Sequence, residues 1–226
     1  MEITQHKKTA LLFGASGLVG GHCLAQLLAH PAYHKVVIFV RRPLGINHPK
    51  LEEHLADFNR LKDYGPLIQG NDLFSCLGTT MAQAGSKEAF FRVDYHYALE
   101  SARLAAEHGA GQLLLVSAVG AHKDSLFFYS RVKGELERAV IKLPFWGFHI
   151  FRPSVLLGGR RESRLGESLA GQFALGLDRL TAGGLLGKYR PVGAETVARA
   201  MVAAAQGLEP GLHVYASDEI HRMAGE

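Results

Sequence analysis

The feature that most constrains this chain is a glycine-rich segment placed between a strand and a helix. Gly14, Gly17 and Gly20 recur at three-residue intervals, directly after the apolar run 9–13 and at the start of the helical pattern 18–29. Glycine at such positions permits a tight turn and close packing between the helix and the strand before it. The sequence therefore predicts a β–α unit whose connecting turn opens the helix.

Short apolar runs alternate with helical patterns along the rest of the chain, as is typical of βαβ units. The predicted strands are residues 9–13, 36–40, 73–77, 113–117, 149–152 and 213–216, with a weaker one at 55–58. The predicted helices are residues 18–29, 87–108, 127–143 and 194–206. Since crossovers between parallel strands are right-handed, this order predicts an α/β fold with a doubly wound parallel sheet, the Rossmann arrangement.

The chain has 226 residues and shows no internal repeat or linker, so we expect a single domain, residues 1–226. The Gly- and Arg-rich stretch within residues 154–192 interrupts the alternation of strands and helices. Long irregular segments in compact domains often border a binding site. We therefore expect residues 154–192 to form a lid over a small-molecule substrate.

Charge and composition exclude several classes of protein. The 25 Lys and Arg residues against 21 Asp and Glu give a mild net charge without long basic runs, which argues against nucleic-acid binding.

The apolar runs are all too short to span a membrane, and the histidines have no metal-ligand spacing. Cys23 and Cys76 are expected to be reduced thiols. We expect a cytoplasmic protein without a metal, and the oligomeric state stays open.

The glycine-rich turn predicts an anion site, because a helix N-terminus offers free N–H groups and a positive partial charge. The pattern favours the pyrophosphate of a dinucleotide over a bare turn, and no Gly-Lys-Ser/Thr follows that would indicate a P-loop. The residues expected to contact the dinucleotide here are Gly14, Ala15, Ser16, Gly17, Leu18, Val19 and Gly20.

Arg41 and Arg42 follow the second predicted strand, where sites for NAD usually carry an acidic residue. Guanidinium groups suit a 2′-phosphate, so NADP(H) is the expected cofactor, although two solvated surface arginines are the alternative. Asp57 and Phe58 lie at the end of the weak predicted strand and are expected to border the adenine, or else to be ordinary loop residues.

Tyr129 and Lys133 lie four residues apart in a helical pattern and therefore share one face. Ser117 ends the strand before that helix, at the edge where doubly wound sheets bind ligands. A nearby ammonium lowers the pKa of a phenol, so Tyr129 is predicted to be a general acid/base, with Ser117 binding the substrate oxygen. The alternative is a tyrosine packed on the sheet beside a lysine that extends to solvent.

These motifs together resemble the short-chain dehydrogenase/reductase superfamily. Further stretches, among them residues 57–61, 76–80, 133–135 and 151–153, are similar to the atypical subgroup that contains the Tat-interacting protein 2 oxidoreductases. The resemblance implies an NAD(P)-binding Rossmann fold and the catalytic set Ser117, Tyr129 and Lys133. It also implies a second group of cofactor-binding residues: Leu77, Gly78, Thr79, Thr80, Lys133, Pro153 and Val155.

One position departs from the superfamily pattern. Asp94 stands where many members carry an Asn that completes a proton relay, so a relay of that kind is not expected here. The sequence predicts an NADPH-dependent oxidoreductase that interconverts a carbonyl and an alcohol. The alternative is a redox-sensing regulator that binds the dinucleotide and a protein partner without turnover, and retention of Tyr129 and Lys133 argues for the enzyme.

Overall fold

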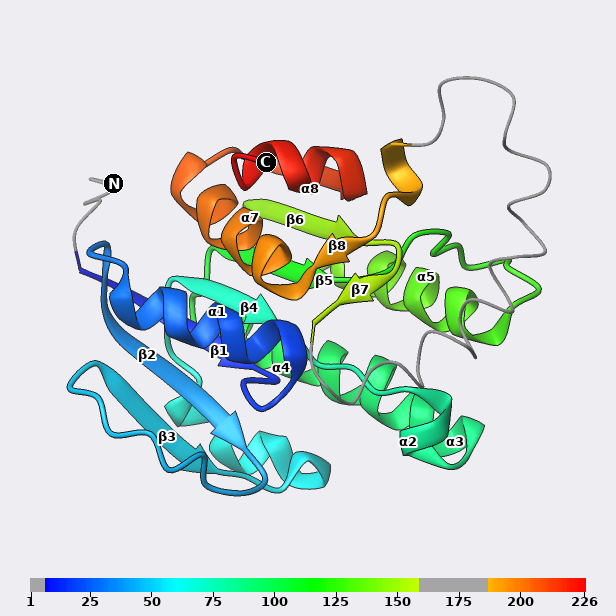
Figure 1. Ribbon diagram of the computed structural model, residues 1–226. Coiled ribbons are helices and arrows are strands. Elements are labelled where there is room, and N and C mark those ends of the chain that lie inside the picture. Colours follow the sequence, from blue (N-terminus) through cyan, green and yellow to red (C-terminus); the bar gives the residue numbers. More distant parts are fainter. Residues whose placement is uncertain (1–6, 159–186) are drawn as a thin grey trace.

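The computed structural model describes residues 7–158 and 187–226 and contains a parallel sheet of seven strands (Figure 1). Its strand order is β3-β2-β1-β4-β5-β6-β9, and every neighbouring pair is parallel. This order, with β1 beside β4 at the point where the winding reverses, confirms the predicted doubly wound fold.

The elements follow the predicted alternation closely. The strands of the large sheet are β1 (Lys8–Phe13), β2 (Tyr33–Val40), β3 (Leu51–Leu55), β4 (Asp72–Ser75), β5 (Gln112–Val116), β6 (Gly147–Arg152) and β9 (Gly211–Ala216). The α-helices are α1 (Leu18–Ala29), α2 (Met81–Ala84), α3 (Lys87–Phe91), α4 (Ala98–Glu107), α5 (Phe128–Val140), α7 (Ala194–Gly207) and α8 (Ser217–Met223). β7 (Leu156–Leu157) and β8 (Val192–Gly193) form a separate small parallel pair.

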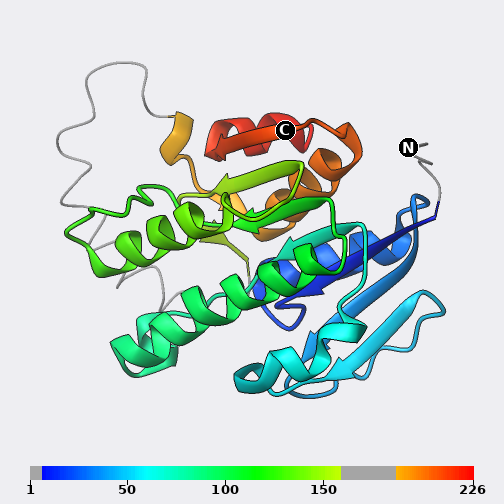
Figure 2. The same ribbon diagram turned by 180° about the vertical axis from the view of Figure 1, so that it is seen from behind.

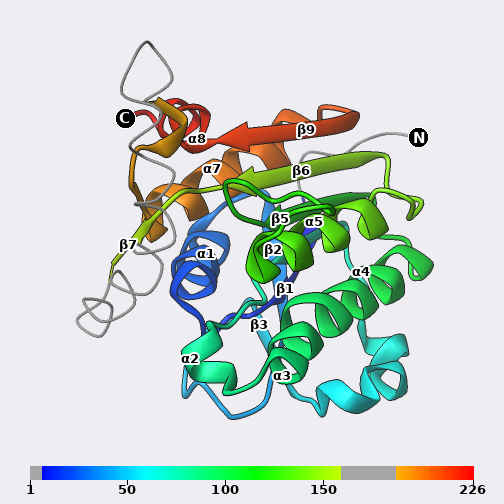
Figure 3. The ribbon, with the colours of Figure 1, turned by 90° about the vertical axis from the view of Figure 1, so that its right-hand side faces the viewer.

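Helices cover both faces of the sheet, and each face has its own apolar core. α1 and α7 pack on one face around residues such as Leu27, Val36 and Met201, which are fully buried. α4 and α5 cover the other face, over Leu11, Leu113 and their neighbours. Figures 2 and 3 show these layers from behind and from the side. Burial on both faces explains why the central strands are continuous apolar runs.

Two predicted elements differ from the structure. The weak strand expected at 55–58 is wrong in position, because the edge strand is β3 and a 3-10 helix, Phe58–Leu67, follows it. β3 is half-exposed and carries Glu52, Glu53 and His54, so it lacks the apolar run on which the prediction relied. The helix expected at 87–108 is divided by a π-helical turn, Arg92–Tyr97, between α3 and α4. The short elements α2, α8, β7 and β8 have no counterpart among the predicted helices and strands.

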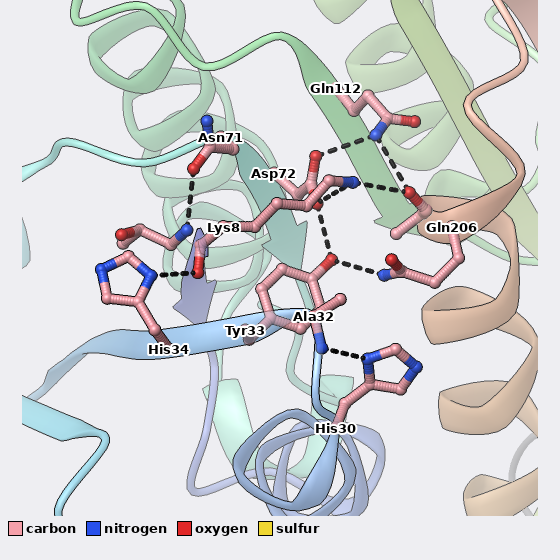
Figure 4. Close-up of polar contacts among 11 residues, drawn as sticks. Lys8, His30, Ala32, Tyr33, His34, Asn71, Asp72, Gln112 and Gln206 are labelled. Carbon is pink, nitrogen blue, oxygen red and sulfur yellow. Dashed lines mark hydrogen bonds and ion pairs between the residues drawn. The ribbon is translucent and has the colours of Figure 1, made fainter. Parts of the chain in front are cut away.

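A cluster of buried polar side chains joins the starts of four strands (Figure 4). Lys8, Tyr33, Asp72 and Gln112 are the first residues of β1, β2, β4 and β5. Asp72 accepts hydrogen bonds from all three others: its Oδ2 lies 3.0 Å from Lys8 Nζ and 2.6 Å from the Tyr33 hydroxyl, and its Oδ1 lies 2.8 Å from Gln112 Nε2. Lys8 Nζ also donates to the carbonyl of Ala205 in α7, at 3.0 Å. The cluster therefore ties the sheet to its last long helix.

We predict that Asp72→Ala lowers the free energy of unfolding by about 3 to 5 kcal/mol, because it leaves the buried Lys8 ammonium without its counter-ion. Urea denaturation measures this loss. Asp124→Ala is the matched control, since Asp124 pairs with Lys123 at the surface with 63% of its side chain exposed, and it should change stability little. Equal effects of the two substitutions would contradict the prediction.

Candidate active site

The carboxyl ends of the parallel strands meet at the sheet edge opposite the Asp72 cluster. Gly14 follows β1, residues 76–80 follow β4, Ser117 follows β5, and Pro153 and Val155 follow β6. Open α/β sheets bind ligands at this edge. The structure therefore places the residues predicted from four separate segments along one edge.

The glycine-rich turn is packed so closely that side chains are excluded from two of its positions. Gly14 has a φ of +88°, and a Cβ there would lie 2.4 Å from the carbonyl oxygen of Cys76. A Cβ at Gly20 would lie 2.0 Å from the carbonyl oxygen of Gly14. At these two glycines, the end of β1, the start of α1 and the segment after β4 lie so close together that no Cβ fits between their backbones. The glycines are thus required by the packing as well as by any ligand.

The start of α1 has the features of an anion site. Gly17 is the N-cap residue, and none of the described residues bonds the free N–H groups with its side chain. The first turn carries no acidic residue. Ser16 and Gly17 are exposed, whereas Ala15 and Val19 are buried against the core. A pyrophosphate fits this cradle, because unpaired N–H groups and the helix dipole both favour a negative charge.

The other residues predicted to bind the cofactor lie around this turn. Arg41 and Arg42 are exposed just beyond β2, and within the described ranges neither forms an ion pair. Asp57 caps the 3-10 helix by accepting the N–H of Asn59 at 2.9 Å. Phe58 is buried, with its ring 6.2 Å from that of Phe13 in an edge-to-face contact. Asp57 and Phe58 therefore both have a structural role in this region. Their contact with adenine remains a prediction.

The segment after β4 is held by backbone and side-chain contacts. The Cys76 N–H donates to the carbonyl of Phe13 at 2.9 Å, which continues the sheet beyond the end of β4. Leu77 is half-buried against the α4 side of the sheet, and Thr80 caps α2 by accepting the N–H of Gln83 at 3.2 Å. The Thr79 N–H donates to Asp94 Oδ2 at 2.8 Å.

Tyr129 and Lys133 lie on one face of α5, as the spacing predicts. Lys133 is buried, and its Nζ lies 2.8 Å from Asp94 Oδ1 in an ion pair whose side chains are 5% and 1% exposed. The Tyr129 ring packs against Phe90, with the ring centroids 5.6 Å apart. The alternative of a lysine that extends to solvent is therefore wrong, because Lys133 points into the protein.

The pKa of Tyr129 is raised, whereas the sequence predicts that it is lowered by the Lys133 ammonium. Burial raises this pKa above its ordinary value of 10.0, the Lys133 ammonium lowers it, and Asp94 raises it again. For Lys133, burial lowers the pKa, but the charge and hydrogen bonding of Asp94 together with the charges of Tyr129 and Glu137 more than offset this, so the net shift is upward. The Lys133 ammonium lowers the pKa of the Tyr129 phenol as predicted, but Asp94 neutralises much of the lysine's charge. Because the net shift of the tyrosine pKa is upward, Tyr129 is protonated at neutral pH.

Ser117 has a partner that the sequence analysis did not anticipate. Its hydroxyl is buried and donates to Glu137 Oε1 at 2.5 Å, and the same oxygen accepts from Arg152 Nε at 3.0 Å. Glu137 lies one turn beyond Lys133 on the face of α5 that carries Tyr129. In this arrangement Ser117 offers its lone pairs, and not its proton, to a ligand.

The contacts of three residues in this site were not predicted: Asp94, Glu137 and Arg152. Glu137 continues the spacing of four residues from Tyr129 through Lys133, so the sequence alone could have indicated its position on the same helix face. Asp94 was singled out only as a departure from the superfamily pattern. No periodicity signal identifies it, because a π-helical turn directs it inward.

The segment after β6 is described only in part. Pro153 is buried, and its carbonyl accepts the N–H of Val119 at 2.9 Å, while Val155 accepts the N–H of Val192 at 2.9 Å next to the small β7–β8 pair. The expected lid, residues 154–192, falls largely on residues 159–186, which lie outside the described residues.

The fold and the glycine-rich turn define an NAD(P)-binding Rossmann protein, and a family model described as NAD(P)H-binding matches residues 14–142. The chain is 40% identical over 176 residues to the protein HTATIP2 of Rattus norvegicus, covering 76% of this chain and 72% of that one. It is 31% identical to the mitochondrial protein FMP52 of Candida albicans, covering 96% and 95% of the two chains. The chain therefore belongs to the NAD(P)H-binding, atypical short-chain dehydrogenase/reductase family of HTATIP2 and FMP52, which confirms the resemblance found in the sequence.

Solved structures share the fold at low sequence identity. MoeE5 in complex with UDP-glucose and NAD has a TM-score of 0.68 at 17% identity, covering 96% of this chain and 81% of that one. The ADP-L-glycero-D-manno-heptose-6-epimerase of Helicobacter pylori has a TM-score of 0.66 at 19% identity, covering 96% and 79%. Similarity at this level supports the arrangement of strands and helices only.

The relatives correct one expectation. FMP52 is a mitochondrial protein in Candida albicans, Candida glabrata and Saccharomyces cerevisiae, so the expected cytoplasmic location is wrong as a simple assignment. That expectation rested on the short apolar runs and on the two cysteines, and neither feature identifies the compartment of a protein. Within residues 7–158 and 187–226, none of the helices has the length and apolar character needed to cross a bilayer.

We predict that Gly20→Ala lowers stability by about 1 to 3 kcal/mol, because its Cβ would meet the Gly14 carbonyl. The displaced turn should also weaken NADPH binding by about tenfold or more, which fluorescence titration measures. Gly21→Ala is the matched control on the next residue, where the added Cβ has only an ordinary contact at 3.7 Å. If both variants bound NADPH like the unmodified protein, the turn would not be the anion site.

Proposed function

We propose that this protein is an NADP(H)-dependent oxidoreductase that interconverts a carbonyl and an alcohol on a small molecule, with Tyr129 as the general acid/base. The observation that carries the proposal is the contact between the acid/base pair and the loop after β4. A Cβ at Gly78 would lie 3.6 Å from Lys133 Nζ, so the predicted cofactor loop and the lysine beside Tyr129 are direct neighbours.

The residues present fit a dinucleotide. In the proposal, the Gly14–Gly20 turn holds the pyrophosphate. Arg41 and Arg42, which form no ion pair with any described residue, hold a 2′-phosphate through charge-assisted hydrogen bonds. The remaining contacts are assigned to Leu77, Gly78, Thr79, Thr80, Pro153 and Val155, with Asp57 near the adenine. When bound, the nicotinamide supplies or accepts a hydride.

The protonation state of Tyr129 favours one direction of the reaction at neutral pH. A neutral phenol donates its proton to a carbonyl oxygen, which is the general-acid step of carbonyl reduction. Lys133 stabilises the phenolate that remains. The Ser117 hydroxyl donates to the substrate oxygen when it turns away from Glu137, and in that orientation we assign it the positioning of the substrate oxygen.

One observation favours the second candidate, a dinucleotide-binding sensor without turnover. Ser117 donates its proton to Glu137, and Lys133 is neutralised by Asp94, so two of the three groups expected to act on a substrate are engaged within the protein. The test below separates this candidate from the enzyme.

We predict that Tyr129→Phe lowers the rate of NADPH-dependent carbonyl reduction by about 100-fold or more while NADPH binding is retained. A panel of aldehydes and ketones, followed by NADPH absorbance, measures the rate. Tyr97→Phe, which removes a hydroxyl that donates to Asn59 Oδ1 at 2.8 Å, is the control and should leave the rate unchanged. NADPH binding without any Tyr129-dependent turnover would favour the sensor.

The same assay has a predicted pH dependence. The general acid is the protonated phenol, whose pKa is raised, so kcat/KM for reduction should stay constant through neutral pH and fall only as the pH rises above about 10. A fall centred near pH 7 that disappears in Tyr129→Phe would contradict a raised pKa.

We predict that Arg41→Ala/Arg42→Ala raises the Kd for NADPH by about 10- to 100-fold and leaves the Kd for NADH nearly unchanged, because only NADPH carries the 2′-phosphate. Arg138→Ala, at an exposed position on α5, is the control for the loss of a surface charge. Equal weakening of both dinucleotides would show that these arginines do not read the 2′-phosphate.

A further inference from the structure

Asp94 occupies a position in which a carboxylate is costly unless both of its oxygens have partners. Its side chain is 1% exposed, and it lies in the π-helical turn Arg92–Tyr97 between α3 and α4. Single π-helical turns within longer helices are often associated with functional sites, because the additional residue redirects a side chain. Here the redirected side chain points between the loop after β4 and α5.

The two oxygens of Asp94 contact different parts of the site. Oδ2 accepts the backbone N–H of Thr79 at 2.8 Å, and Oδ1 pairs with Lys133 Nζ at 2.8 Å. The Oδ1 atom also lies 3.4 Å from the position of a Cβ at Gly78. One carboxylate therefore connects the predicted cofactor loop to the lysine of the acid/base pair.

The other charged groups around the pair leave Asp94 as the counter-ion of Lys133. Glu137 faces Lys133 from the next turn of α5, but its carboxylate is bound by the guanidinium of Arg152 from β6 and by Ser117. Tyr129 faces Lys133 from the preceding turn. Among the described residues, Asp94 is thus the carboxylate in direct ion-pair contact with the lysine.

We propose that Asp94 is a positioning residue that holds the Lys133 ammonium against the Gly78–Thr79 loop and sets the pH at which the Tyr129–Lys133 pair loses its first proton. The inference deepens the proposed function and rests on it. The negative charge of Asp94 makes removal of a proton from the adjacent pair less favourable, whichever of the two groups releases it.

An amide is a poor substitute at this position. Asn has one acceptor oxygen, whereas Asp94 accepts the Thr79 N–H with one oxygen and forms an ion pair with Lys133 through the other. An Asn that kept the bond to Thr79 would therefore direct its NH₂ group toward the Lys133 ammonium. A neutral residue would also leave the Lys133 ammonium without a counter-ion in a buried site. The Asp therefore differs in charge and in hydrogen bonding from the Asn of other superfamily members.

The test is the titration of the Tyr129–Lys133 pair in Asp94→Asn, followed by NMR of tyrosine labelled with ¹³C at Cζ and of lysine labelled with ¹³C at Cε. The two signals are assigned by Tyr129→Phe and Lys133→Met. We expect the first proton of the pair to leave at a pH lower by about one to two units than in the unmodified protein. Asp124→Asn removes one carboxylate from the exposed loop before α5 and should leave the titration unchanged. Unchanged titration in Asp94→Asn would overturn the proposal.

Rate measurements separate a positioning role from a purely structural one. Asp94→Asn should lower kcat and shift the alkaline limb of the pH profile to lower pH, while Asp94→Glu, which keeps the charge, should keep the limb near its original pH. If Asp94→Asn does not fold, Asp94→Ser provides the same comparison with a smaller side chain. A lower rate with an unmoved limb in the neutral variant would overturn the proposal.

The two proposals fail in distinguishable ways. Absence of Tyr129-dependent turnover in the unmodified protein would remove the oxidoreductase function, yet the Cζ titration needs no substrate and would still report the effect of Asp94. Conversely, turnover that depends on Tyr129, together with a titration insensitive to Asp94, would leave the function standing and remove the inference.

Discussion

The close backbone contact at the glycine-rich turn is the constraint on which the rest of this site depends. Gly14 and Gly20 allow the end of β1, the start of α1 and the segment after β4 to approach within distances that exclude any side chain. That approach orients the free N–H groups of α1 toward the carboxyl edge of the sheet. It also places the loop with Gly78 and Thr79 beside the helix that carries Lys133.

Two buried ion pairs lie at the two ends of this sheet and have different roles. The Lys8–Asp72 pair joins the starts of the strands to α7, far from the glycine-rich turn, and all of its partners are structural. The Asp94–Lys133 pair lies at the opposite edge and contacts the loop and helix of the proposed active site. In each pair, the two buried charges compensate each other. Only the Asp94–Lys133 pair lies next to groups that change protonation during the proposed reaction.

Much of the fold was predictable because burial on both faces gives the central strands continuous apolar runs, and α1 agrees with its predicted range exactly at both ends. Prediction failed where that signal is absent. The edge strand β3 is half-exposed and rich in charge, and the π-helical turn leaves the apolar pattern of residues 87–108 nearly intact. The positions of Tyr129 and Lys133 followed from helical spacing, whereas the partners of Ser117 did not.

The sequence by itself determined the doubly wound topology, the turn that opens α1 and the common face of Tyr129 and Lys133, because periodicity and glycine spacing are local properties. Only the tertiary structure decided that Tyr129 has a raised pKa, that Asp94 neutralises Lys133 and that Ser117 donates to Glu137. These properties depend on charges and hydrogen-bond partners from segments distant in the chain, and on the degree to which water is excluded around them.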